Sequence, residues 1–213
     1  MSRIIVVLGT DTEIGKTVLS AALVGALGAR YWKPVQSGLD GPESDSETVA
    51  RLAALGPGRV LPEAYRLTAP LSPHRAAELD RVEIDPDAIR PPPPDPDGRP
   101  LVVEGAGGLM VPLTRRRLLV DMVAGWGAPV VLAARTALGT INHTLLSLEA
   151  LKRRGAPVLG VAFVGDPVPD SEAVIEEISG ARRLGRLPRL DPLTPETLAA
   201  AFQAGFRRED FEV

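Results

Sequence analysis

Cysteine is absent from this chain of 213 residues, and histidine occurs only as His74 and His143. Without cysteine the chain has no disulfide, no thiol nucleophile, no cysteine-ligated zinc and no thiolate-ligated iron–sulfur cluster. Two imidazoles are too few to build a histidine-based metal site, so a bound metal would be held mainly by oxygen atoms. Oxygen ligands favour magnesium among the common metal ions.

An excess of positive charge and a long apolar run are also lacking. The formal net charge is −3 and the isoelectric point is near 5.5, so no basic field gathers nucleic-acid phosphates or anionic lipids. No apolar stretch is long enough to cross a membrane. We therefore expect a cytoplasmic protein that has neither nucleic acid nor membrane as a main partner.

The remaining composition is that of an ordinary globular protein. Hydrophobic residues make up 45% of the chain and charged residues 24%, and these values exclude wholesale disorder. A length of 213 residues suits one α/β domain of ordinary size. We accordingly expect residues 1–213 to form a single domain.

Short apolar runs that suit buried strands alternate along the chain with segments of helical pattern. This alternation indicates βαβ crossovers, and hence an α/β fold with a mostly parallel sheet and helices on both faces. The proline-rich stretch 90–100 is expected to be a surface loop, because proline lacks the N–H donor and restricts the residue before it. The expected strands are 3–8, 31–35, 101–103, 129–133 and 158–164, and the expected helices are 15–28, 45–55, 119–126, 142–154, 171–178 and 194–206.

A glycine-containing loop, GTDTEIGKT at residues 9–17, lies between the first expected strand and the first expected helix. A Walker A loop requires this context: backbone N–H groups wrap phosphates, Lys16 reaches the outer phosphates, and the Thr17 hydroxyl binds magnesium. Thr10 occupies the position where the common motif has its first glycine. The plainer interpretation is a turn and a helix start. Strand, loop and helix together favour a P-loop NTPase fold that binds a nucleotide.

Within the P-loop class, partition-type ATPases carry a second lysine five positions before the loop lysine. Here that position holds Asp11, whose negative charge is unable to stabilise phosphate across a dimer. This subclass is therefore disfavoured. An ATPase switch that binds a protein partner stays open as the alternative to an enzyme.

Lysine is scarce, because among 24 basic residues only Lys16, Lys33 and Lys152 are lysine. Lys33 begins the run KPVQSG, which follows an expected strand at the carboxyl edge of the sheet, where ligands collect in open α/β folds. In a chain that otherwise uses arginine, lysine at 16 and 33 indicates a need for a compact point charge. A solvated surface lysine is the alternative interpretation of Lys33, and Lys152 has no motif around it.

Two carboxylates are candidate ligands for magnesium. Glu104 ends the apolar strand in VVEGAGG, an arrangement of the Walker B type in which the acid reaches magnesium directly or through water. Asp45 opens an expected helix, where aspartate is commonly the N-cap. Spacing alone favours the cap role for Asp45 over the metal.

Five motifs together resemble the dethiobiotin synthetase family: GTDTEIGKT, KPVQSG, SPH at residues 72–74, VEGAGGLMVPL, and GTINHTLL from Gly139 onward. They follow the family's order from about residue 3 to residue 192, and the combination is highly specific although any one motif is weak. The resemblance implies a homodimeric, magnesium-dependent enzyme of biotin synthesis. Such an enzyme closes 7,8-diaminopelargonic acid with CO₂ or bicarbonate and ATP into a cyclic urea, and releases ADP and phosphate.

The same resemblance implies roles for individual residues around the phosphates. It reverses the preference for a cap at Asp45, because this residue falls on a magnesium ligand of the family. The implied catalytic residues are Thr12, Lys16 and Lys33; the implied magnesium ligands are Thr17, Asp45 and Glu104; the residues that bind phosphate or border the nucleotide are Glu13, Ile14, Gly15, Lys16, Thr17, Val18, Asp45, Glu104, Gly105, Ala106 and Gly107.

Further residues are implied at the two ends of the site. The helix start after Gly139 resembles the segment that receives the substrate carboxylate from the neighbouring subunit, and free N–H groups there suit an anion. Asn142 also suits a helix N-cap, and His74 and His143 are expected to be structural or pocket-wall residues rather than bases. The implied substrate contacts are Ser37, Gly139, Thr140, Ile141 and Asn142, and the implied base-lining residues are Gly165, Asp166, Pro188, Arg189 and Leu190.

Gly165 is a departure from the family pattern, because many members have Asn-Asp where this chain has Gly165-Asp166. A glycine offers no side-chain amide to recognise adenine, so base selectivity is open. We hypothesise that other nucleoside triphosphates are accepted. A different ATP-dependent synthetase or an amidase-linked enzyme of the same fold is a further rival, but it is not expected to carry KPVQSG so near the first helix.

Overall fold

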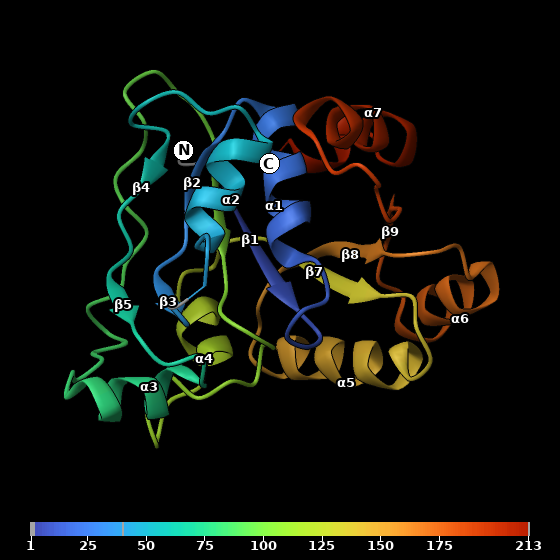
Figure 1. Ribbon diagram of the computed structural model, residues 1–213. Helices are drawn as coiled ribbons and strands as arrows, with labels where there is room; N and C mark the ends of the chain where they lie inside the picture. The colour runs from blue at the N-terminus through green and yellow to red at the C-terminus, as the bar shows by residue number, and fades with distance from the viewer. Residues whose placement is uncertain (1–2, 40, 213) are drawn as a thin grey trace.

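A seven-stranded sheet forms the centre of the computed structural model, which describes residues 3–39 and 41–212 (Figure 1). The strand order is β4-β2-β6-β1-β7-β8-β9, and every pairing between these strands is parallel. This confirms the α/β expectation. The strands are β1 (Ile4–Gly9), β2 (Arg30–Trp32), β4 (Val60–Leu61), β6 (Leu101–Glu104), β7 (Val130–Arg135), β8 (Val158–Val164) and β9 (Arg183–Leu187).

Helices cover both faces of the sheet, as expected (Figure 1). Side chains alternate along a strand, so Ile5 and Val7 of β1 pack with α1, α2 and α7, whereas Val6 and Leu8 pack with α4 and α5. The helices are α1 (Lys16–Leu27), α2 (Asp45–Leu52), α3 (Pro73–Asp80), α4 (Leu119–Ala124), α5 (Thr140–Arg153), α6 (Pro169–Ser179), α7 (Pro195–Gly205) and the 3₁₀ helix η1 (Arg208–Phe211).

The expected strand 31–35 is wrong, because the chain leaves the central sheet in the middle of it. β2 ends at Trp32, and β3 (Val35–Ser37) pairs with β5 (Tyr65–Leu67) in a separate two-stranded parallel sheet. Pro34 lies between the two strands and has no N–H to donate to a sheet ladder. The break leaves Lys33 outside the ladder, at the carboxyl end of β2.

Helix α5 begins two residues earlier than expected. Its N-cap is Gly139 and its first residue is Thr140, so Asn142 lies within the first turn and is not the cap. The expected loop 90–100 is confirmed, because it contains neither helix nor strand. Arg30 of β2 fixes this loop through Asp95, at 2.9 Å, and through the carbonyl of Pro93, at 3.0 Å.

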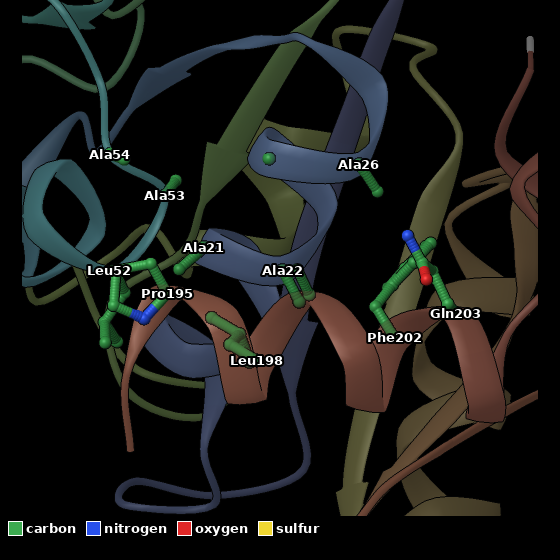
Figure 2. Close-up of a pocket in the computed structure, with 12 residues that line it drawn as sticks. Ala21, Ala22, Ala26, Leu52, Ala53, Ala54, Pro195, Leu198, Phe202 and Gln203 are labelled. Carbon is green, nitrogen blue, oxygen red and sulfur yellow. The ribbon is translucent and has the colours of Figure 1, made fainter. Parts of the chain in front are cut away.

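An apolar hollow of about 400 Å³ lies between α1, α2 and α7. Figure 2 shows Leu198 and Phe202 of α7 beside Ala21 and Ala22 of α1. The small alanine side chains leave this space between the helices, and none of the residues that line it is titratable. Its lining therefore offers no group for acid–base, phosphate or metal chemistry. No helix in the described ranges is long and apolar enough to cross a membrane.

Candidate active site

Three neighbouring strands bring the predicted phosphate and metal residues to one edge of the sheet. β2, β6 and β1 lie side by side and are parallel, so their carboxyl ends meet. Lys33 follows β2, Glu104 ends β6, and the loop 10–15 joins β1 to α1. This is the edge at which ligands bind in open α/β sheets.

Lys16 lies along the phosphate-binding loop and is buried. Its Nζ donates to the carbonyl of Asp11 at 2.8 Å. The side chain runs so close to Gly9 that a Cβ added there would lie 2.7 Å from Lys16 Cδ. A side chain at position 9, at the end of β1, would therefore displace Lys16 from this path.

Glu104 is the centre of a buried polar cluster and is only 1% exposed. One carboxylate oxygen, Oε2, accepts from the hydroxyl of Tyr31 at 2.9 Å. The other, Oε1, accepts from Thr17 Oγ1 at 2.9 Å and from Lys33 Nζ at 3.1 Å. Lys33 also forms an ion pair with Asp45. The solvated-surface interpretation of Lys33 is therefore wrong, because its side chain is buried between two carboxylates.

The cluster shifts the protonation equilibria of its members. Burial acts to lower the pKa of Lys33, but the charges of Glu104 and Asp45 outweigh it and the pKa is raised. Burial acts to raise the pKa of Asp45, but Lys33 outweighs it and the pKa is lowered. Both groups are thus held in their charged forms. For Lys16, burial dominates and lowers the pKa to about 8.

Asp45 is free for this cluster because another residue caps its helix. Ser44 is the N-cap of α2: its hydroxyl accepts from the N–H of Glu47 at 3.3 Å, and Glu47 Oε2 accepts from the N–H of Ser44 at 2.7 Å. This reciprocal capping box gives hydrogen-bond acceptors to two backbone N–H groups at the start of the helix. The cap interpretation of Asp45 is therefore wrong, and its carboxylate faces Thr17 and Lys33 instead.

The oxygen atoms around Thr17 fit a magnesium ion. The Thr17 hydroxyl has one proton but lies 3.0 Å from Asp45 Oδ1 and 2.9 Å from Glu104 Oε1, so lone pairs outnumber protons at this point. A hard divalent cation suits such a set of oxygens. Across residues 3–39 and 41–212, no three His, Cys, Asp or Glu side chains are grouped for a metal.

A cavity of about 450 Å³ opens beside this cluster. Lys33 and Asp45 line it together with several other residues for which the resemblance implies roles, namely Thr12, Glu13, Ser37, Ala106 and Gly107. Sequence reasoning missed other members of the wall, among them Gln36, Leu71 and Ser72. The SPH motif was the available signal for Ser72, whose hydroxyl lies 2.9 Å from His74 Nδ1.

Tyr31 was also missed, although it binds Glu104 directly. Its side chain is fully buried, and burial followed by the charge of Glu104 raises its pKa well above the ordinary tyrosine value. It therefore stays a neutral hydrogen-bond donor. The available signal was its position two residues before Lys33, which predicts the same side of the strand. An aromatic residue in a short apolar strand nevertheless resembles ordinary core.

The residues implied for the nucleobase gather at the ends of two other strands. Gly165 follows β8, and its N–H donates to the carbonyl of Leu187, the last residue of β9, at 2.9 Å. Pro188 and the two residues after it follow β9 directly. Val164 lies against Gly15, since a Cβ added at Gly15 would lie 2.7 Å from Val164 Cγ1. The end of β8 thus adjoins the phosphate-binding loop.

The segment from Gly139 to Asn142 does not line the cavity beside Glu104. Gly139 and Asn142 are exposed at the start of α5, and Thr140 is buried with its hydroxyl 3.4 Å from that of Thr144. His143 lies on the wall of a separate hollow with Thr10, Asp11 and Thr12. The structure therefore does not bring this segment to the site of its own chain.

Comparison with known proteins identifies the family. A model of the family described as "AAA domain" matches residues 3–197. A protein of Brucella anthropi named ATP-dependent dethiobiotin synthetase BioD is 62% identical over 206 residues, which is 97% of this chain and 95% of that protein. The chain belongs to the dethiobiotin synthetase family. A second member of that family, from Rhizorhabdus wittichii, is 60% identical over 99% of both chains.

Two solved ATPase structures share the fold of this chain. A ParA family ATPase from Chlorobium tepidum matches with a TM-score of 0.52 and 11% identity, over 95% of this chain and 91% of that one. The cell division ATPase MinD of Pyrococcus furiosus matches with a TM-score of 0.53 and 14% identity, over 96% and 99%. These identities show the fold alone, and they confirm the P-loop expectation.

Proposed function

We propose that this chain is an ATP-dependent dethiobiotin synthetase. It closes 7,8-diaminopelargonic acid with CO₂ into the cyclic urea dethiobiotin and cleaves ATP to ADP and phosphate. The observation that carries the proposal is the convergence of two buried ammonium groups, Lys16 and Lys33, with three oxygen ligands beside a cavity of about 450 Å³. Membership of the family supports the same activity.

The chemistry needs charge stabilisation more than a nucleophilic side chain. One substrate amine captures CO₂ as a carbamate and releases a proton. A carbamate oxygen attacks the γ-phosphorus of ATP, ADP leaves, and a carbamic-phosphoric anhydride forms. The second amine attacks the carbonyl carbon, phosphate leaves, a proton is lost and the ring closes. Lys16 and Lys33 stabilise the negative charge of the carbamate and of the transferred phosphoryl group.

Thr17, Asp45 and Glu104 would hold magnesium in this proposal. A bound magnesium ion neutralises phosphate charge during phosphoryl transfer. The ion pairs that Lys33 makes with Asp45 and Glu104 hold its ammonium group beside the proposed magnesium ligands. Tyr31 orients Glu104 by binding the oxygen that faces away from Lys33 and Thr17. Thr12 lines the same cavity, and in this proposal it contacts the reacting groups.

The nucleotide and the substrate would extend away from this centre in different directions. Phosphates lie on residues 13–18 and along residues 104–107, and the base lies near Gly165 and residues 188–190. The diamino acid occupies the cavity at Ser37, and its carboxylate binds the free N–H groups at the start of α5 of a second subunit. The protein is accordingly a cytoplasmic homodimer with one P-loop domain over residues 1–213.

A coupled assay of phosphate release tests the proposal. A synthetase releases phosphate only when ATP, magnesium, diaminopelargonate and bicarbonate are all present, and the product carries one carbon from bicarbonate. Omission of the diamine or of bicarbonate is expected to stop the reaction. A partition-type switch would instead hydrolyse ATP slowly without any diamine, and that result would refute the synthetase assignment.

A further inference from the structure

A second charge cluster, centred on a buried carboxylate, lies away from Glu104 and joins α6 to β9. Its centre is Glu172 of α6, which is 3% exposed. Arg183 of β9 binds Glu172 Oε2 through Nε at 2.7 Å and through Nη2 at 2.6 Å. Arg186 of the same strand lies with its Nε 3.2 Å from Oε1, as an ion pair without hydrogen-bond alignment. One buried carboxylate thus holds two arginines.

The two arginines differ in what else they touch. Arg186 Nη1 donates to the carbonyl of Gly165 at 3.3 Å. Gly165 lies in the turn that joins β8 to α6. Among the hydrogen bonds and ion pairs of residues 3–39 and 41–212, Arg183 has no side-chain contact with this turn. Arg186 therefore ties the turn to Glu172, while Arg183 shares only the carboxylate.

Gly165 is fixed on every side. Its φ is +130°, a conformation that side chains rarely adopt, and an added Cβ would fall on the hydroxyl of Thr136 at the end of β7. Its N–H is bound by the carbonyl of Leu187 and its carbonyl is bound by Arg186. The turn consequently has no side chain at this buried position, and both polar backbone groups of Gly165 are bonded within the protein, one of them to Arg186.

We infer that Arg186, held by Glu172, is a positioning residue for nucleotide binding: it fixes the Gly165 turn against which the nucleobase lies. The inference rests on the proposed function for the location of the base. The structure adds that the end of β8 adjoins the phosphate-binding loop through Val164 and Gly15. A displaced turn would therefore weaken contact with the base end of the nucleotide and leave the phosphate contacts intact.

The test compares Arg186→Leu with Arg183→Leu, a matched control from the same strand that removes an arginine from the same carboxylate. Affinity for ATP is measured by calorimetry with magnesium and without diamine, alongside affinity for inorganic triphosphate as a probe that lacks the base. For Arg186→Leu we expect a Kd for ATP raised by about tenfold, the scale of a lost charged hydrogen bond, and an unchanged Kd for triphosphate. For Arg183→Leu both values stay within about twofold of the parent.

Several outcomes overturn the inference. Equal Kd values for ATP in the two leucine variants would mean that the cluster is only structural. Equal weakening of ATP and triphosphate would mean that Arg186 acts through its overall charge. Arg186→Lys keeps a donor but cannot span both partners, so its Kd for ATP should lie between the parent and Arg186→Leu. If Arg186→Leu does not fold, an unchanged Kd in Arg186→Lys overturns the inference.

The parent protein is assayed first in the coupled reaction. If it binds ATP but does not use the diamine, the proposed function fails while the comparison of Kd values still tests Arg186. If the parent is an active synthetase and the two leucine variants bind ATP equally, the inference about Arg186 fails alone.

Discussion

The two ends of the proposed nucleotide site differ in the kind of residue that forms them. At the phosphate end, Lys33, Asp45 and Glu104 are charged side chains that bind one another inside the protein. At the base end, Gly165 has no side chain, and Asp166 and Arg189 are exposed. Phosphoryl transfer from ATP to a carbamate requires particular ionised groups at fixed points, whereas a base can be held by shape and by uncharged groups. The phosphate end should therefore be sensitive to changes in its charged side chains, and the base end should accept different nucleobases.

The largest effect is expected from removal of the Lys33 charge. We predict that Lys33→Ala lowers kcat by about 10²-fold or more, the scale of a lost transition-state charge partner, and leaves nucleotide binding largely intact. Lys33→Arg should also lower kcat, because a planar guanidinium group does not replace the compact ammonium group between Asp45 and Glu104. Steady-state kinetics and calorimetry of ATP binding measure both effects.

Lys152→Ala is the matched control, because Lys152 is exposed on α5. Its kcat should equal that of the parent. Near-parental turnover in Lys33→Ala would remove the proposed distinction between the two ends, since the buried ion cluster would then be structural.

A smaller effect is expected from Tyr31, which acts on the phosphate end through Glu104. Tyr31→Phe leaves Glu104 Oε2 without its donor at 2.9 Å. We predict a kcat lower by about tenfold and a higher magnesium requirement, because the carboxylate is less firmly oriented. Titration of activity with magnesium separates a weaker orientation of Glu104 from a general loss of stability.

Tyr65→Phe is the control for the same chemical change. The Tyr65 hydroxyl accepts from the N–H of Asp85 at 3.0 Å, away from the Glu104 cluster. Its magnesium titration should match that of the parent. If both variants shift alike, or neither does, the orienting role of Tyr31 is wrong.

A comparison of nucleotides tests whether the base end accepts different nucleobases. Because Gly165 carries no side-chain amide, we predict that kcat/KM for ATP, GTP and CTP lies within about tenfold of one another. The phosphate contacts are common to all three nucleotides, so kcat should vary less than KM. A strong preference for ATP over both others would show that this end also discriminates, and the contrast between the two ends would be lost.

Sequence patterns are clearer at the proposed phosphate end than at the proposed base end, for a physical reason. Loops that wrap phosphate need glycine and lysine at fixed spacing, so Lys16, Thr17 and Glu104 lie in readable motifs. The central strands β1, β6, β7 and β8 were also predictable, because strands buried on both faces are continuous apolar runs. Strand β9 reads RLGRL, lies at the sheet edge and was missed.

Other features depend on contacts between distant segments and leave no local pattern. Ser44 and Asp45 are both good helix caps, and only the position of Lys33 decides which of them caps α2. The break after Trp32 depends on the pairing of β3 with β5. Arg186 lies in no motif, because it contacts a backbone carbonyl that any residue type could supply. Glu172 is recognisable only through its pairing with Arg183 and Arg186 across two elements.

The smallest effect is expected outside both ends, at Asp121 of α4. Burial acts to raise the pKa of this carboxyl, but hydrogen bonds from Arg154, at 2.6 Å, and from the N–H of Leu118, at 3.1 Å, outweigh it and the pKa is lowered. The charged form therefore favours folding above the unfolded value of 3.8, and this contribution is lost as pH falls through the lower folded pKa.

We predict that Asp121→Asn lowers Tm by about 2–4 °C at pH 7, the shift for a loss near 1 kcal/mol in a chain of this size. The difference from the parent should shrink below about pH 4, where the parent carboxyl also becomes neutral. Thermal unfolding at a series of pH values measures it, and kcat at pH 7 should not change because Asp121 contacts neither end of the site. A difference in Tm that stays constant down to pH 2 would mean that lost packing, rather than lost charge, causes the destabilisation.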